Sequence, residues 1–121
     1  MNFQDLNVYK QSSSLFPRIY NLVKSWQIFD QRHLGAQLIR ATNSIHANIA
    51  EGQSKTTKDY MRFISISIGS CDEVRSHLLD SLNVGLITKA VYESFDRELI
   101  SIGKQLTNLK KSLQSRLITS P

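Results

Sequence analysis

Residues 63–70 read FISISIGS, and the fold class depends on whether this run is a strand or a helix. Taken alone, the alternation of isoleucine and serine is typical of a half-buried strand. However, the flanks KDYMR and CDEVRSHLLDSL continue a helical period without a turn signal. A lone strand would also lack a partner for its backbone groups. The run is therefore predicted to be helical, and its isoleucines spread over a wide apolar arc that favours self-association.

The composition agrees with a helical protein of modest size. The 121 residues suit one domain, and only five glycines and two prolines interrupt them. No apolar run approaches the roughly 20 residues that span a bilayer, and the N-terminus does not have the pattern of a signal peptide. The single cysteine excludes an internal disulfide and suits a reducing compartment. We therefore expect a cytoplasmic protein without a membrane partner.

Apolar periodicity predicts four helices, at residues 5–26, 32–51, 57–84 and 89–117. The last of them repeats its apolar residues with 3–4–3–4 spacing from Tyr92 to Leu113, which is typical of a bundle seam. The connections are short, so successive helices should pack antiparallel. The expected fold is a single all-α domain over residues 1–121, an antiparallel up-down-up-down four-helix bundle.

Local signals refine the helix boundaries. Pro17 cannot donate a backbone hydrogen bond, so we expect a kink or a restart there, which the serines at 12–14 could cap. Gly52 and Gly85 are expected just past the second and third helices, where a positive φ is needed. The sequence TTKD at 56–59 has the spacing of a capping box at the start of the third helix.

The chemistry-bearing residues do not combine into a catalytic or metal site. Glu73, His77 and Asp80 share one face of the third helix, but the paired Glu-x-x-His motifs of a di-iron bundle are missing. Cys71 falls in an apolar stripe, where burial should raise its pKa and make it inert. The run EGQSKTT has one glycine and follows a helix, so it is not a P-loop. We expect no enzyme, no catalytic residue, no cofactor and no bound metal.

Positive charge is concentrated in the fourth helix. The net charge is +5, and no acidic side chain occurs in the C-terminal part of that helix. Arg97, Lys104 and Lys111 are seven residues apart and share an outer face, which Lys110 and Arg116 widen. Such a face can follow a nucleic-acid backbone without reading sequence. The alternative is a solubilising face opposite the leucine seam.

A second group of cations surrounds the start of the third helix. Its first N–H groups lack partners, and Lys55, Lys58 and Arg62 stand around them, so this corner can bind a backbone phosphate. The alternative is an ordinary capped corner with solvated lysines.

Polar residues repeat along one side of the second helix. Gln37, Arg40, Asn48 and Glu51 follow a 3.5-like spacing, and Glu73 of the third helix could join them. We expect a structural polar network within or between subunits, which sets register and pairing.

Three stretches carry a family resemblance: QLIRATNSIHANIAEG (37–52), KDYMRFISISIGSCDEV (58–74) and HLLDSLNVGLIT (77–88). They resemble the bacterial four-helix-bundle proteins encoded in intervening sequences of 23S ribosomal RNA genes. The core phrase of that family is approximately Q-L-x-R-A-x-x-S-I-x-x-N-I-A-E-G, and the matching residues here are Gln37, Leu38, Arg40, Ala41, Ser44, Ile45, Asn48, Ile49, Ala50, Glu51 and Gly52. The next helix matches through Phe63, Gly69, Ser70, Glu73 and Leu78. The chain departs from the pattern at His46, where proline is frequent, and at Arg75, where glutamate is frequent.

The resemblance implies a left-handed bundle, no known catalysis, and assembly into a ring, a pentamer. A related group is the accessory protein of diversity-generating retroelements, which partners a reverse transcriptase and binds nucleic acid. By that analogy the expected function is non-enzymatic binding of an RNA or DNA backbone by a homo-oligomer, through its basic faces. The alternative is a protein-interaction scaffold that presents an apolar groove to a partner such as a polymerase.

Overall fold

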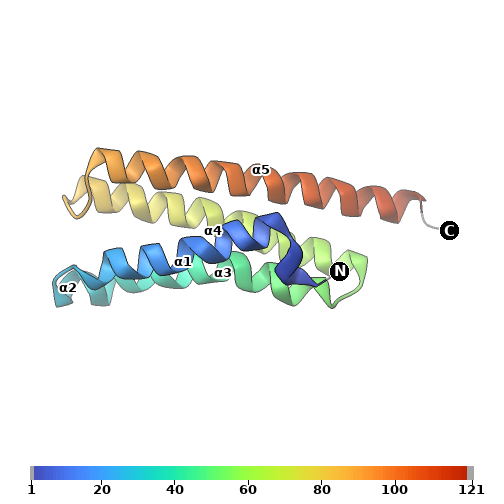
Figure 1. Ribbon diagram of the computed structural model, residues 1–121, viewed down its shortest axis with the longest axis horizontal. Coiled ribbons are helices and arrows are strands. Elements are labelled where there is room, and N and C mark those ends of the chain that lie inside the picture. Colours follow the sequence, from blue (N-terminus) through green and yellow to red (C-terminus); the bar gives the residue numbers. More distant parts are fainter. Residues whose placement is uncertain (1, 120–121) are drawn as a thin grey trace.

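The computed structural model, which describes residues 2–119, consists of four long helices that reverse direction at each corner (Figure 1). These helices are α1 (Asn7–Lys24), α3 (Ala36–Gln53), α4 (Thr57–Asn83) and α5 (Lys89–Thr119). Three short elements complete the order: the 3₁₀ turn η1 (Phe3–Asp5), α2 (Ile28–Asp30) and the π-helical turn η2 (Gln31–Gly35). Every regular element within residues 2–119 is helical, which confirms the predicted all-α class.

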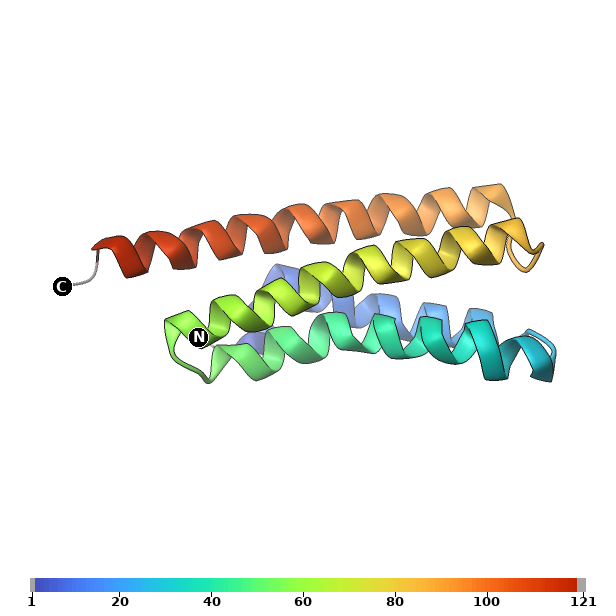
Figure 2. The ribbon, with the colours of Figure 1, turned by 180° about the vertical axis from the view of Figure 1, so that it is seen from behind.

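The helices form two antiparallel hairpins, α1 with α3 and α4 with α5 (Figure 1). From behind, α3 lies along α4, and this contact joins the two hairpins (Figure 2). By contrast, α1 and α5 touch sparsely. Polar side chains connect them: Arg18 pairs with Glu98, and Gln105 donates to Gln11 over 2.6 Å. The bundle is therefore tightest along α3 and α4 and most open between α1 and α5.

The run FISISIGS lies within α4, and its serines explain why the helical interpretation is correct. Ile64 is fully buried, whereas Ile66 is 42% exposed, so the isoleucines do spread around the helix. Ser67 is buried and donates to the carbonyl of Ile45 over 2.8 Å, and Ser70 donates to Ser44 Oγ over 2.8 Å. These small polar side chains let α3 and α4 approach closely while their hydroxyls remain hydrogen-bonded.

The core contains the predicted seam of α5. Leu99, Ile102, Leu106 and Leu113 are almost fully buried, and Tyr92, Phe95 and Leu109 pack against the core from partly buried positions. On α1 the core stripe runs through Val8, Leu15, Ile19 and Val23. Tyr9 and Phe16, which follow an apolar 3–4 spacing along the same helix, are only half-buried, and their rings lie edge-on to the ring of His46 on α3.

The helix does not restart at Pro17, so of the two predicted outcomes, a kink or a restart, the structure excludes the restart. α1 runs continuously from Asn7 to Lys24 with Pro17 inside it. The serine hydroxyls cap nothing; Ser12 donates to the carbonyl of Val8 over 2.7 Å, and Ser14 to that of Gln11 over 2.8 Å. Serine hydroxyls commonly bond back within a helix in this way.

Gly52 has a different role from the one predicted. It lies inside α3, which continues to Gln53, and its φ is not positive. A Cβ at Gly52 would stand 2.7 Å from Tyr60 Cδ1 and 2.8 Å from Phe63 Cβ. Only a residue without a side chain fits there, because the two helices meet so closely at their corner. Gly85, in contrast, follows α4 with a φ of 83°, as predicted.

The other helix boundaries differ slightly from the sequence-based ones. α3 begins at Ala36, after the π-helical turn, and not near residue 32. A Cβ at Gly35 would meet Val23 Cγ1 and the backbone oxygen of Asp30, so the widened turn lies tightly against the end of α1. At the start of α4, Thr56 Oγ1 accepts from the amide of Asp59, which confirms the N-cap. None of the described helices combines the length and apolar character that crossing a bilayer requires.

Candidate nucleic-acid interface

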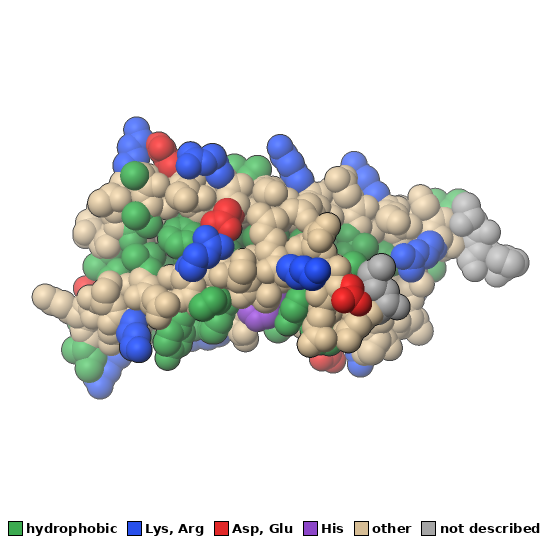
Figure 3. All heavy atoms as spheres, in the orientation of Figure 1, with side chains coloured by type: hydrophobic (Ala, Val, Ile, Leu, Met, Phe, Trp, Pro, Cys, Tyr) green, Lys and Arg blue, Asp and Glu red, His purple; other side chains and the backbone are tan. Residues whose placement is uncertain are grey.

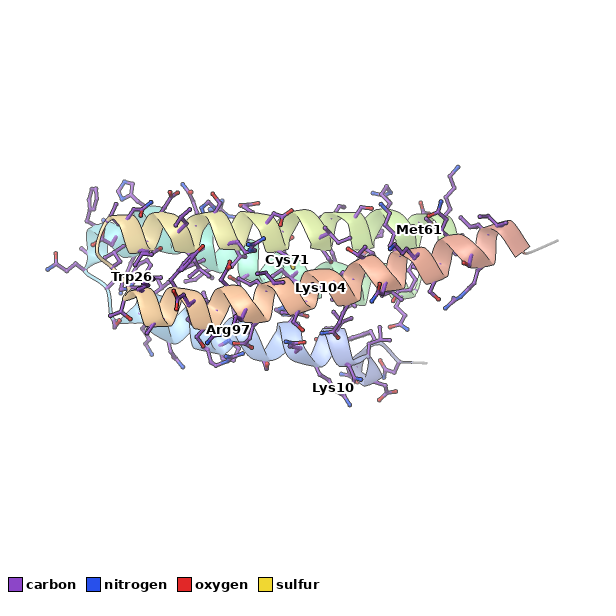
Figure 4. The ribbon with its side chains drawn as sticks, turned by 90° about the horizontal axis from the view of Figure 1, so that it is seen from above. Lys10, Trp26, Met61, Cys71, Arg97 and Lys104 are labelled. Atoms are coloured by element: carbon purple, nitrogen blue, oxygen red, sulfur yellow. The ribbon has the colours of Figure 1, made fainter. Side chains whose placement is uncertain are left out.

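The outer side of α5 carries a row of cations without compensating acids, the α5 ridge, defined by Arg97, Lys104 and Lys111. All three are exposed, and none forms an ion pair with another residue between 2 and 119. Lys and Arg side chains project at intervals along the edge of the molecule over α5 (Figure 3). Figure 4 shows Arg97 and Lys104 along this helix. The ridge is therefore accessible and carries an uncompensated positive charge.

The acids nearest the ridge in sequence are already paired with arginines from other helices. Glu98 accepts two hydrogen bonds from Arg18, of 2.6 and 2.7 Å, and Asp96 accepts two from Arg75, of 2.7 and 3.5 Å. The hydrogen bond to Glu98 raises the pKa of Arg18, and that to Asp96 raises the pKa of Arg75. These carboxylates thus stabilise interhelical contacts and leave the ridge uncompensated.

Two hollows flank the ridge, and Lys104 lines both. The first, the α4–α5 groove, has a volume of about 480 Å³ and an apolar floor that includes Ile68, Leu99 and Ile100. Lys111 also lines this groove. The second, of about 450 Å³, is lined by residues of α5 alone, among them Arg97 and Gln105. The ridge therefore stands between two concave surfaces.

Two cations predicted to widen this face lie elsewhere. Lys110 is half-buried. Arg116 lines a separate hollow of about 370 Å³ at the corner between α3 and α4, where Lys55 also lies. The structure thus brings together two cations that the sequence assigned to different sites. We call this hollow the corner cavity; its lining residues are Leu6, Gln53, Lys55, Thr57, Tyr60, Leu109 and Arg116.

The other two predicted corner cations do not line this cavity. Arg62 is 3.9 Å from Asp59, and its guanidinium lies over the ring of Phe63 at 4.7 Å. Lys58 is exposed. The predicted cluster of Lys55, Lys58 and Arg62 is therefore divided between the cavity and the surface of α4.

The predicted polar residues do not form a network within one chain. Gln37, Arg40, Glu51 and Glu73 are exposed, and none of them bonds to another. Asn48 donates to the carbonyl and the hydroxyl of Ser44, at 2.7 and 3.0 Å. Glu51 is 3.6 Å from Lys55, and Glu73 is 3.2 Å from His77. A network between subunits stays a prediction.

The residues considered for catalysis have ordinary structural environments. Cys71 is buried, and burial raises the pKa of its thiol to about 12, as the apolar stripe predicted. His77 bonds to Glu73 as an i,i+4 pair. Across residues 2–119 no group of three His, Cys, Asp or Glu side chains is placed to hold a metal.

Sequence reasoning missed an aromatic cluster between α1 and α3. The ring of His46 lies edge-on to Tyr9 and Phe16, with centroid distances of 5.9 and 5.8 Å. Its Nδ1 is buried without a hydrogen-bond partner, and burial lowers its pKa. Tyr9 and Phe16 follow an apolar 3–4 spacing along the first helix, which is typical of core residues and gave no sign that they are only half-buried. Gln53 and Tyr60 of the corner cavity gave no sequence signal either.

Comparison with known proteins agrees with this architecture. The family model described as "23S rRNA-intervening sequence protein" matches residues 4–108. A crystal structure of a protein of unknown function from the S23 ribosomal protein family of Bacteroides thetaiotaomicron superposes with a TM-score of 0.76 at 26% identity. The match covers 86% of this chain and 98% of that one. No curated protein matches the chain.

Proposed function

Because the chain belongs to the 23S rRNA-intervening sequence protein family, we propose that it is a non-enzymatic, oligomeric helical-bundle protein that binds the backbone of RNA or DNA. The observation that carries this proposal is the uncompensated charge of the α5 ridge. Arg97, Lys104 and Lys111 project from one helix, while the neighbouring acids Asp96 and Glu98 are bound to arginines. Regularly spaced, unpaired cations suit a chain of phosphates and carry no information about base sequence.

The test compares two triple variants that remove the same charge. Arg97, Lys104 and Lys111 are changed to glutamine in one, and Lys10, Lys24 and Arg32 in the other; all six side chains are exposed. Lys10, on α1, lies away from the ridge (Figure 4). Affinity for a short single-stranded RNA is measured by fluorescence anisotropy at several salt concentrations. Since both variants lose three charges, a general effect of net charge would lower both affinities equally.

We expect wild-type affinity to fall steeply with salt, and the ridge variant to lose both affinity and salt dependence. Each lost phosphate contact lowers the slope of log affinity against log salt by roughly 0.7 for a single strand. The control triple variant should keep most of the affinity and the slope. No binding at low salt, or an equal loss in both variants, would contradict backbone binding through the ridge.

Self-assembly is the second part of the proposal. Ile66 and Ile100 are 42% and 37% exposed on α4 and α5, and Phe29 is 67% exposed on α2. A homo-oligomer, which the family resemblance predicts to be a pentamer, would cover such side chains and repeat the ridge around a ring. Light scattering coupled to size-exclusion chromatography, with and without RNA, measures the mass. A monomeric mass at micromolar concentration would contradict assembly.

The α4–α5 groove favours one alternative, a scaffold for a protein partner such as a polymerase. Its floor of Ile68, Leu99 and Ile100 is apolar, and a helix of a partner could lie in it. A complex that survives nuclease treatment and high salt would support this alternative over backbone binding.

A further inference from the structure

The corner cavity combines features that suit a doubly charged anion. Its walls come from four parts of the chain: the start of α1, the end of α3, the first turn of α4 and the last turns of α5. Its volume of about 370 Å³ lies in the lower part of the range, roughly 300–1,000 Å³, that is usual for small-ligand sites. Lys55 and Arg116 are in the wall, and none of the carboxylates within residues 2–119 is. The α4–α5 groove differs, because Asp72 lines it beside its cations.

Both cations are available to a ligand. Arg116 makes no hydrogen bond or ion pair within the part of the chain that the structure describes; burial raises the pKa of the Tyr60 hydroxyl, and the positive charge of Arg116 opposes this shift. Lys55 is 3.6 Å from Glu51, but Glu51 is itself 58% exposed, so this pair is weak and exchanges readily with water.

The first turn of α4 adds unpaired backbone donors beside the cavity. Thr56 Oγ1 accepts from the Asp59 amide, and the Thr56 carbonyl accepts from the Tyr60 amide. The amides of Thr57 and Lys58 have no acceptor among the described residues. In a helix of 27 residues these two N–H groups lie at the positive end of the helix dipole.

Tyr60 supplies an independent observation that points to a ligand. It is only 7% exposed, it forms part of the cavity wall, and its hydroxyl is buried without a hydrogen-bond partner. Arg116 lines the same cavity. Buried hydroxyls are nearly always bonded in folded proteins, so an unpaired one beside a cation indicates a missing acceptor.

Gln53 of the same wall also has a buried atom without a partner. This atom is Oε1, which can only accept a hydrogen bond. A half-turn of the amide exchanges Oε1 with Nε2, and the buried position would then hold an unpaired donor. Two buried polar groups therefore lack partners around one hollow that is lined by cations.

We propose that the corner cavity binds a phosphate monoester, the terminal phosphate of a nucleic-acid strand, through Arg116, Lys55, Tyr60 and the first amides of α4. A monoester carries a charge near −2 and three acceptor oxygens, which matches two cations and several converging donors. An internal phosphodiester carries one charge and must continue on both sides, whereas Leu6 and Leu109 form apolar parts of this wall. That the phosphate belongs to a nucleic-acid strand rests on the proposed function, because free phosphate presents the same chemistry to the cavity.

The experiment separates the two sources of phosphate. Fluorescence anisotropy measures the affinity for two pairs of short RNAs of the same sequence. The first pair is labelled at the 3′ end and carries either a 5′-phosphate or a 5′-hydroxyl. The second pair is labelled at the 5′ end and either carries or lacks a 3′-phosphate. Thermal unfolding in inorganic phosphate, against chloride at equal ionic strength, tests free phosphate. Each measurement uses the wild type, Arg116→Gln, Tyr60→Phe, and Lys104→Gln as a control of equal charge on the ridge.

We expect one phosphorylated end to bind about tenfold tighter than its hydroxyl form. Arg116→Gln should abolish this advantage and Tyr60→Phe should reduce it, while Lys104→Gln should weaken all strands alike. The preference should shrink below about pH 6, where the monoester gains a proton. Tyr60→Phe should not lower thermal stability without ligand, because it removes a hydroxyl that has no partner.

The possible failures are distinguishable. If no strand binds, backbone binding fails, but stabilisation by inorganic phosphate that disappears in Arg116→Gln would still support the cavity as a site for free phosphate. If strands bind with equal affinity whatever their ends, and phosphate stabilises no more than chloride, the cavity proposal is wrong and ridge binding remains.

Discussion

Gly52 of α3 faces Tyr60 of α4 so closely that a Cβ on Gly52 would stand 2.7 Å from Tyr60 Cδ1. A methyl group there would also meet Phe63 Cβ at 2.8 Å, and neither atom is the end of a flexible side chain. We expect Gly52→Ala to lower the free energy of unfolding by about 1–3 kcal/mol, because the corner must open to admit the methyl group. Urea unfolding followed by circular dichroism measures this loss.

Gly69 offers the matched control for that substitution. It also lies inside a helix, but a Cβ there would meet nothing within 4 Å. Gly69→Ala should therefore stabilise the protein by about 0.5–1 kcal/mol, since alanine lowers the entropy of the unfolded chain. An equal effect of both substitutions would show that helix propensity, and not the close contact, governs Gly52.

The Arg18–Glu98 pair should connect α1 to α5 only weakly. Its two hydrogen bonds, of 2.6 and 2.7 Å, are short, but the Arg18 side chain is 47% exposed. A double-mutant cycle with Arg18→Gln and Glu98→Gln should give a coupling energy of about 0.5 kcal/mol, which declines at high salt. A coupling above about 2 kcal/mol would show that the pair is shielded from water, as in an assembled oligomer.

Cys71 should be unreactive in the folded protein. Burial raises the pKa of its thiol to about 12, so almost no thiolate exists at pH 8. A thiol reagent such as Ellman's reagent should react slowly with the native protein and rapidly after urea denaturation. Fast reaction of the native protein would indicate that α4 opens locally.

The same thiol predicts a loss of stability at alkaline pH. Its folded pKa is raised, so the native state keeps a proton that the unfolded chain releases from about pH 9. The contribution of the protonated thiol to the free energy of unfolding is fully present below the pKa of the unfolded chain. It is lost as the pH rises towards 12. Cys71→Ala should flatten that part of the stability profile, and an unchanged slope would contradict the assignment.

His46 predicts a change at the acid side of neutrality. Burial lowers its pKa, so the folded protein takes up a proton on His46 at a lower pH than the unfolded chain, which does so near pH 6.5. The contribution of neutral His46 to the free energy of unfolding is present above the pKa of the unfolded chain. It is lost as the pH falls through the pKa of the folded protein. His46→Gln should reduce the loss of stability below pH 6.5. Nuclear magnetic resonance titration should show a lower pKa for His46 than for an unfolded control peptide.

Much of the architecture follows from local patterns. The 3–4–3–4 spacing of α5 placed Leu99, Ile102, Leu106 and Leu113 in the core, and burial confirms it. The flanks of FISISIGS correctly predicted helix, because a helix satisfies its own backbone groups whatever lies beside it. The positive ridge also follows directly, since residues seven apart must share a face.

Contacts between segments that are distant along the chain could not be predicted from the sequence. Tyr9 and Phe16 follow an apolar 3–4 spacing that is typical of core residues, but whether such residues are covered depends on the neighbouring helices, and both side chains are only half-buried. The role of Gly52 was misread because its own φ is ordinary and the constraint comes from Tyr60.

The sequence by itself determined the helices, their order and the faces that carry charge, because periodicity and breaker residues act over one or two turns. The tertiary structure alone decided which cations meet. Arg116 and Lys55 belong to separate patterns along the chain, yet the antiparallel packing of α3, α4 and α5 brings them around one cavity. Such a convergence depends on helix lengths and corner geometry, which no local pattern contains.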